Sequence, residues 1–317
     1  MTLPAFPPLL RAVVTLILLG VVLMAVDRQA IWELWQQALP GLLLAALALS
    51  VVQVVLSAWR WRYTAGRLGI HLSMKRAVAE YYLATLINQI LPGGVLGDAS
   101  RALRHGTGRS ARIGDSQPTS PVPMHKAVHA VMIERLSGQM ALFPVVVVSL
   151  LFTPAGMTLW RYADSPLATL QAAAWGLGAL LLVAVILGLL FWRAAMRLGR
   201  DVFQALIRWP APLWQQGSSL LVVFTYIGIY FLAARALQID TATLVLLPLI
   251  PLVLLSMLVP FTVSGWGIRE GAAAALWAMM GLPPAEGVAI SVTYGLLILV
   301  SSLPGLATPL ISRHLPR

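Results

Sequence analysis

The sequence predicts an all-α polytopic membrane protein, in which six full transmembrane helices and two re-entrant helical hairpins form an inverted-topology repeat of about eight membrane segments. Of its 317 residues, 59% are hydrophobic and only 10% are charged, which is typical of a polytopic membrane protein and not of a soluble domain. Apolar runs long enough to cross a bilayer recur along the chain, and Lys and Arg gather in alternate loops between them. We therefore expect a single membrane domain over residues 1–317.

The full spans follow from the length of the apolar runs. About 20 apolar residues cross a bilayer as a helix. The runs of suitable length are residues 9–26, 39–59, 127–152, 167–192, 217–237 and 285–312. Two further segments, 76–104 and 242–281, are interrupted by glycine and proline, and charge decides how they are interpreted.

The segment 76–104 has basic sequence on both sides. Loop 60–76 holds five Lys or Arg and no acid, and loop 101–126 holds five against Asp115. Cytoplasmic loops collect Lys and Arg, so both flanks are predicted on the cytoplasmic side. The apolar arm 77–91 reaches about 22 Å as a helix and must then turn back at Pro92-Gly93-Gly94, which predicts a re-entrant hairpin.

The charges of the remaining loops predict that the segment 242–281 has the opposite membrane orientation to the segment 76–104. Loop 193–216 and the tail after residue 312 are basic and are predicted inside, as are both termini. Segments 27–38, 153–166 and 238–241 are neutral or acidic and are predicted outside. The second interrupted segment therefore begins and ends outside, as a hairpin entering from the opposite face. The alternative is eight ordinary spans.

One short motif occurs twice, once in each predicted hairpin. Residues 92–101 (PGGVLGDASR) and 260–269 (PFTVSGWGIR) both have Pro, then Gly five positions on, then Arg nine positions on. Interrupted segments in corresponding places of two halves indicate the central site of a transporter. We therefore predict two inverted halves, 1–155 and 160–317, whose hairpin tips lie near each other at mid-depth.

Apart from charges at or near the ends of the predicted membrane segments that the flanking loops account for, seven charged residues in these segments need an explanation. A charge at this depth costs about 2.5–3.5 kcal/mol even on the gentler scales, so these side chains should face the interior and have partners. They are Glu80, Asp98, Arg101, Glu134, Arg135, Arg269 and Glu270.

Two interpretations of these charges stay open. Glu134-Arg135 is explained equally well by ion pairs that lock helices together. Capping and ion pairing at the turns would account for Asp98, Arg101 and Arg269-Glu270, but explain less well why both copies place Arg at the same offset.

The functional interpretation of the motif is a phosphate site. We expect a half-helix to begin after each glycine, with its unpaired N–H groups and its positive dipole end aimed into the membrane centre. Guanidinium groups beside such N–H groups suit phosphate, and glycine permits close backbone approach, although the glycines could equally be helix-packing motifs. Candidates for substrate binding are Asn88, Pro92, Gly93, Gly94, Gly97, Asp98, Arg101, Glu134, Arg135, Gly265, Gly267, Arg269 and Glu270. Candidates for carrying a coupled proton are Glu80, Glu134 and Glu270.

No motif predicts an enzyme. The chain has no Cys, its five His show no metal-ligand spacing, and neither a Ser-His-Asp set nor a Gly-x-Ser-x-Gly element is evident. We expect no catalytic residue, no cofactor and no metal. The formal net charge of +11 resides in the basic loops, so we interpret it as membrane orientation and expect no nucleic-acid partner.

The motifs resemble the lysylphosphatidylglycerol synthase transmembrane-region family, whose members are flippase-like integral membrane proteins. The matching elements are residues 88–94 (NQILPGG) with Gly97-Asp98 and Arg101, residues 134–138 (ERLSG), and Pro260 with residues 265–270 (GWGIRE). The resemblance covers nearly the whole chain, and Gly-x-Gly-x-Arg-Glu is its most specific part. We expect a stand-alone member without the synthase domain.

This resemblance implies a lipid transporter or flippase of the bacterial cytoplasmic (inner) membrane. Its substrate would be a phosphate-bearing lipid, either a phospholipid or a polyprenyl-phosphate-linked lipid, moved between the leaflets. The expected partner is a membrane lipid with an anionic or zwitterionic head group; a second copy of the chain or an envelope-synthesis protein is a further candidate. Two alternatives remain: an intramembrane enzyme that modifies a lipid, and a non-transporting scaffold for envelope-lipid synthesis.

Overall fold

The computed structural model describes residues 8–91, 96–106, 123–161, 192–258 and 262–308, and within these ranges the regular structure is entirely helical. The helices are α1 (Pro8–Ala25), α2 (Arg28–Gln36), α3 (Pro40–Arg67), α4 (Met74–Ile90), α5 (Leu96–Gly106), α6 (Met124–Phe152), α7 (Pro154–Arg161), α9 (Trp192–Val202), α10 (Ala211–Ala236), α11 (Thr243–Ser256), α12 (Ile268–Met279) and α13 (Pro284–Ser302). The π-helix η2 (Phe203–Ile207) follows α9, and the 3₁₀-helix η3 (Leu303–Ala307) extends α13.

Four helices are long and apolar enough to cross a membrane: α3, α6, α10, and α13 with η3. They match four of the predicted spans. The predicted span 9–26 is α1, which is followed by an 89° bend into α2, and this pair is a fifth candidate. The bend is fixed by Asp27, whose carboxylate accepts the N–H groups of Gln29 and Ala30 and so starts a new helix. The predicted span 167–192 lies almost wholly outside the described residues.

Both predicted hairpins consist of two helices separated by a break. In the first, α4 packs against α5; in the second, α11 packs against α12. The longest of the four, α4, has 17 residues and extends about 25 Å, so none of them crosses the roughly 30 Å hydrocarbon core by itself. This agrees with the hairpin interpretation, and entry from opposite membrane faces stays a prediction. Pro92, Gly93, Gly94 and Pro260 lie outside the described residues.

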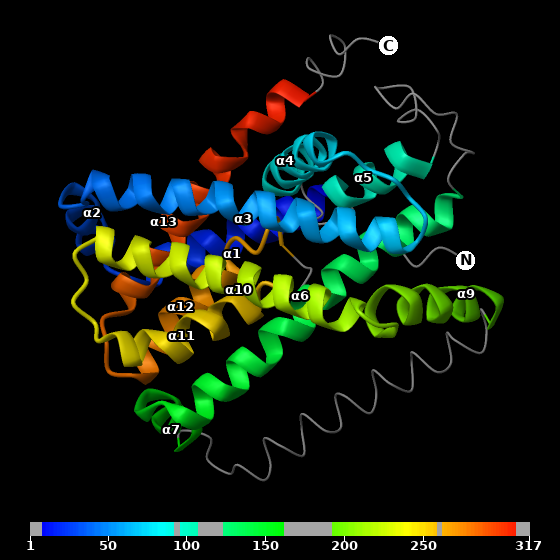
Figure 1. The fold of residues 1–317 in the computed structure, drawn as a ribbon. Coiled ribbons are helices and arrows are strands. Elements are labelled where there is room, and N and C mark those ends of the chain that lie inside the picture. The colour runs from blue at the N-terminus through cyan, green and yellow to red at the C-terminus, as the bar shows by residue number, and fades with distance from the viewer. Residues whose placement is uncertain (1–7, 92–95, 107–122, 162–191, 259–261, 309–317) are drawn as a thin grey trace.

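Helices α3 and α10 lie side by side along the molecule, and α6 and α13 pack against both (Figure 1). The large apolar cluster fills the space between α10, α11, α12 and α13, where Trp277, Tyr230 and Ile290 are fully buried. A polar seam runs between α3 and α10, because Gln53 donates to Tyr226 at 3.0 Å and Arg60 donates to Ser219 at 3.2 Å. Buried polar groups of this kind must be paired inside a membrane protein.

Described parts of three loops that are predicted on one side of the membrane contact one another at one end of the molecule. Arg67 at the end of α3 donates to the carbonyls of Gln204 and Arg208, and Lys126 at the start of α6 donates to the carbonyl of Leu68. At the other end, the start of α3 lies near the end of α10 (Figure 1), and the Leu39 N–H donates to the Ala236 carbonyl at 2.8 Å. This grouping of basic loops at one end agrees with the alternation of Lys- and Arg-rich loops in the sequence. Which end is cytoplasmic stays a prediction.

Candidate functional site

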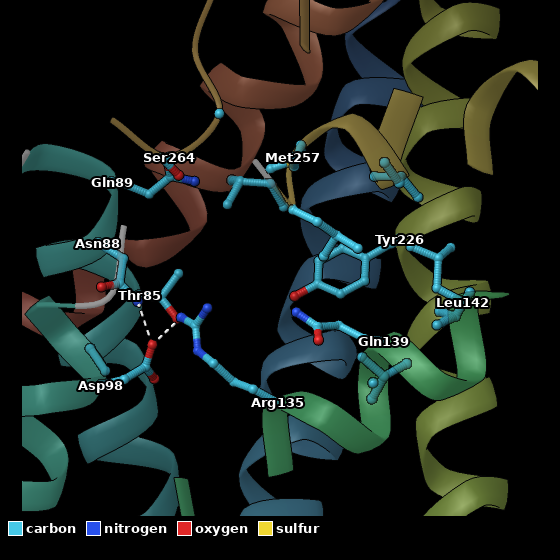
Figure 2. Close-up of a pocket in the computed structure, with 18 of the residues that line it drawn as sticks. Thr85, Asn88, Gln89, Asp98, Arg135, Gln139, Leu142, Tyr226, Met257 and Ser264 are labelled. Atoms are coloured by element: carbon cyan, nitrogen blue, oxygen red, sulfur yellow. Dashed lines mark hydrogen bonds and ion pairs between the residues drawn. The ribbon is translucent and has the colours of Figure 1, made fainter. Parts of the chain in front are cut away.

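A cavity of about 520 Å³ is lined by residues that flank the breaks of the two predicted hairpins. The first hairpin contributes Asn88, Gln89 and Asp98, and the second contributes Met257 and Ser264, as Figure 2 shows. Two segments about 170 residues apart in sequence therefore line one space. That the hairpin tips meet at mid-depth of the membrane stays a prediction.

The cavity is lined by both polar and apolar side chains, which we call its polar wall and its apolar wall. Hydroxyl and amide groups come mainly from α4, α6 and the second break: Thr85, Asn88, Gln89, Gln139, Tyr226, Thr262 and Ser264. The apolar wall comes mainly from α10, α11 and α13: Leu142, Val222, Val223, Leu254, Met257, Leu258 and Ile298. An amphipathic molecule fits such a lining, since its polar and apolar parts find matching surfaces.

Five charged residues form a connected ion cluster beside the cavity, which we call the five-charge cluster: Arg60, Asp98, Arg101, Glu134 and Arg135. Asp98 and Arg101 lie one turn apart on α5, and Glu134 and Arg135 are adjacent on α6. Glu134 accepts from Arg60 and from Arg101, the latter at 3.2 Å, and Asp98 accepts from Arg101 at 2.8 Å and from Arg135. These pairs join α3, α5 and α6.

Arg135 is the member of this cluster that is exposed. Its side chain is 41% exposed, whereas those of Arg60 and Arg101 are 6% and 1% exposed. In Figure 2 the Arg135 side chain extends from α6 across the cavity floor toward Asp98. A ligand in the cavity would meet this guanidinium group first.

Asn88 connects the two arms of the first hairpin. Its Nδ2 donates to Asp98 Oδ2 at 3.1 Å, and its Oδ1 accepts the Gly97 N–H at 2.8 Å. Asn88 therefore satisfies an N–H group in the first turn of α5, a role that the sequence suggested for Asp98. Asp98 instead lies inside α5 and uses its carboxylate for Arg101, Arg135 and Asn88. Gly97 is needed here, because a Cβ at this position would overlap the backbone of Ala84 on α4.

The second hairpin carries a separate buried pair, Arg269-Glu270. Both side chains are 0% exposed, and Arg269 donates to Glu270 Oε1 at 2.7 and 3.0 Å and to the Ser291 hydroxyl at 2.9 Å. The other carboxylate oxygen of Glu270 accepts the Gly267 N–H at 2.6 Å. The start of α12 is thus capped by Glu270, and this N–H is not free as the sequence-based hypothesis expected. Gly267 has φ +85°, a conformation that favours glycine.

The two motif arginines occupy matching surroundings. The Arg101 guanidinium lies 4.4 Å from the Trp61 ring centroid and 4.7 Å from that of Tyr81. The Arg269 guanidinium lies 4.7 Å from Trp266 and 5.2 Å from Tyr294. Both tyrosines line the cavity, whereas neither arginine does. Each arginine thus sits behind a cavity tyrosine, held by cation–π contacts and by an acid.

The structure separates the predicted site residues into three groups. Asn88, Asp98, Glu134, Arg135 and Gly265 line the cavity. Gly97, Arg101, Gly267, Arg269 and Glu270 are buried outside the lining. Pro92, Gly93 and Gly94 lie outside the described residues. Substrate binding by any of them stays a prediction.

Glu80, a candidate for carrying a proton, pairs with Arg104 at 2.6 Å and does not line the cavity.

The sequence-based set missed several lining residues, among them Arg60, Gln139 and Tyr226. The predicted span 39–59 places Arg60 in the following loop, but α3 continues to Arg67 and buries Arg60. Gln139 lies one helical turn after Arg135, a signal that could have placed it on the same face of α6. Ser264 directly precedes Gly265 and has φ +50°, which the sequence does not reveal.

Comparison with known proteins gives one match. A model of the family described as lysylphosphatidylglycerol synthase TM region matches residues 9–305. No curated protein and no solved structure matches the chain.

Proposed function

Because this chain belongs to the lysylphosphatidylglycerol synthase TM region family, we propose that it is a transporter that moves a phosphate-bearing lipid between the two leaflets of the cytoplasmic membrane. Its apolar helices and its family make it an integral membrane protein. The observation that carries the proposal is the cavity between the two breaks, with Arg135 exposed inside it.

Phosphate binding would use Arg135. A guanidinium group forms paired, charge-assisted hydrogen bonds with two phosphate oxygens. Asp98, the present partner of Arg135, would keep Arg101 and the Asn88 amide when Arg135 turns to phosphate. Exchange of the partner therefore leaves no buried carboxylate unpaired, which keeps the cost of the exchange low. The acyl chains would lie along the apolar wall and leave toward the lipid.

Movement would involve the first hairpin and α6. Asp98–Arg135 and Arg101–Glu134 both join α5 to α6, and a head group that competes for Arg135 weakens one of these links. The matched surroundings of Arg101 and Arg269 support an inverted repeat, in which one half rocks against the other around a central site. Of the three acids considered for proton coupling, Glu134 is the one that lines the cavity.

The test is lipid translocation in vesicles that contain the purified protein. Fluorescent phospholipids are reconstituted, and a membrane-impermeant quencher measures how fast inner-leaflet lipid reaches the outer leaflet. We expect the wild-type protein to move lipid faster than protein-free vesicles do, and Arg135→Ala to lose most of this activity. The matched control is Arg67→Ala, which removes an arginine that binds backbone carbonyls at one end of the molecule.

Two outcomes would contradict the proposal. If the wild-type protein moves every phosphate-bearing lipid tested no faster than empty vesicles do, the protein is not a transporter of these lipids. If Arg135→Ala moves lipid at the wild-type rate, Arg135 is not the phosphate site. Release of a chemically modified lipid, measured by mass spectrometry of the same vesicles, would indicate the enzyme alternative.

A further inference from the structure

The five-charge cluster carries a formal excess of positive charge. Three guanidinium groups, Arg60, Arg101 and Arg135, share two carboxylates, Asp98 and Glu134, which leaves a net charge of +1. Four of the five residues are among the most buried polar groups described, with at most 7% residue exposure. Among the described residues the cluster is therefore one negative charge short, and of its three guanidinium groups that of Arg135 is the one exposed to a ligand.

Hydrogen bonding shows the same shortage. Nε and Nη1 of Arg101 are buried and have no acceptor in the structure. The rings of Trp61 and Tyr81 hold this guanidinium group through their faces, but they do not supply a negative charge. An anion on Arg135 would balance the cluster as a whole, because the ion pairs link all three guanidinium groups through shared carboxylates.

The rest of the described cavity lining is uncharged. Apart from Arg60, Asp98, Glu134 and Arg135, its polar groups are hydroxyls and amides such as Thr85, Gln89 and Ser264. For an ammonium group in the cavity, the two lining carboxylates, Asp98 and Glu134, are already ion-paired with three arginines. The net positive charge of the cluster would also repel it. Hydroxyl groups of a ligand, in contrast, can both donate to and accept from these amides and hydroxyls.

Resting on the proposed function, we propose that the transported head group is a singly charged phosphodiester joined to an uncharged polyol, and not an amine-bearing head group. One phosphodiester supplies the single negative charge that the cluster lacks. The hydroxyl groups of the polyol can form hydrogen bonds with the hydroxyl and amide groups of the polar wall. This chemistry occurs in glycerophospholipids with a glycerol or inositol head group and in polyprenyl phosphodiesters of a sugar. An aminoacylated or ethanolamine head group would bring an ammonium group, and among the described lining residues both acids, Asp98 and Glu134, are already paired with arginines.

The first experiment compares translocation rates in the same vesicle assay. The substrates are phosphatidylglycerol, phosphatidylinositol, phosphatidylethanolamine, lysylphosphatidylglycerol and a polyprenyl phosphoryl hexose. We expect the polyol phosphodiesters to move at least about tenfold faster than the two amine-bearing lipids, because an unpaired buried charge is strongly discriminated against. The glycerophospholipid and polyprenyl arms distinguish the two sources of the head group.

The second experiment changes the charge of the cavity. Gln139→Glu adds an acid of nearly the same shape to the lining, one turn from Arg135, and balances the cluster from within. We expect this variant to move phosphatidylglycerol more slowly and the amine-bearing lipids faster, so that the rate ratio falls about tenfold. The matched control is Gln204→Glu, which adds an acid on exposed η2 and should keep the wild-type ratio.

The outcomes separate the two proposals. If the wild-type protein moves amine-bearing lipids as fast as polyol lipids, the head-group inference is wrong and transport stands. An unchanged ratio in a monodisperse Gln139→Glu protein also overturns the charge argument. If no lipid moves, the proposed function itself fails. The wild-type comparison decides the question even where the variant does not fold.

Discussion

The structure predicts that truncating Arg269 and truncating Arg135 impair different properties of the protein. Arg269→Ala should lower stability, whereas Arg135→Ala should lower transport. The two residues are both arginines within the membrane part of the chain, but Arg269 is 0% exposed and outside the cavity lining, and Arg135 is 41% exposed and inside it.

The loss of stability in Arg269→Ala follows from the buried carboxylate of Glu270, which the substitution leaves without its arginine. Removal of one partner of a buried ion pair costs about 3–5 kcal/mol, because the other charge stays buried and uncompensated. Glu270 would keep the Ser291 hydroxyl and the Gly267 N–H, so we expect the lower end, about 3 kcal/mol. That corresponds to a fall in melting temperature of about 4–5 °C for a chain of 317 residues.

The size of the second effect is smaller. Asp98 keeps Arg101 and Asn88 when Arg135 is truncated, and a partly exposed ion pair contributes about 1 kcal/mol or less. Thermal unfolding in detergent and translocation in vesicles are measured for both variants.

A double substitution makes the test sharper. Adding Glu270→Gln to Arg269→Ala removes the stranded charge, so the double variant should be more stable than Arg269→Ala alone, with a coupling energy of about 1–3 kcal/mol. The result that would refute the reasoning is an Arg269→Ala protein of unchanged melting temperature that no longer transports lipid. Arg269 would then contact the substrate, as the repeated motif first suggested.

Three further predictions concern packing, topology and the phosphate contact. Gly97→Ala should lower the melting temperature, since a Cβ would overlap the α4 backbone and overpacking costs about 1–3 kcal/mol; the control Gly199→Ala meets nothing within 4 Å and should be neutral or stabilising. Cysteines at Gln204 and Asp240, both exposed in a chain without native Cys, should react with a membrane-impermeant thiol reagent from opposite sides; same-side labelling would contradict the charge-based topology. Arg135→Lys should recover part of the transport lost in Arg135→Ala, because an ammonium group cannot form the paired contact of a guanidinium group; full recovery would show that charge alone suffices.

The all-helical membrane fold was accessible from the sequence because its signals are local. Apolar length, Lys and Arg in loops, and Pro or Gly breaks act within a few residues of where they occur. The two breaks therefore indicated the segments that meet at the cavity. The 89° bend after α1 was less visible, since it depends on one capping residue, Asp27.

The assignment of each arginine depended on tertiary packing. Adjacent residues on a helix point about 100° apart, so Glu134 and Arg135 cannot face the same side of α6. Both line the cavity, but the Glu134 side chain is 1% exposed and that of Arg135 is 41% exposed. This difference follows from how α6 is rotated against α3 and α5, which no local pattern specifies. Arg101 and Arg269 share their offset in the motif, but the side chains of Tyr81 and Tyr294 stand between these arginines and the cavity.

The most direct test of the account is to locate the lipid itself. The wild-type protein in lipid nanodiscs that contain phosphatidylglycerol is imaged by cryo-electron microscopy, with Arg135→Ala as the matched control. The account predicts a phosphate density within hydrogen-bond distance of the Arg135 guanidinium, beside Asn88, that is lost in the variant. Head-group density confined to the outer surface of the helices, with the cavity empty or unchanged in Arg135→Ala, would contradict it.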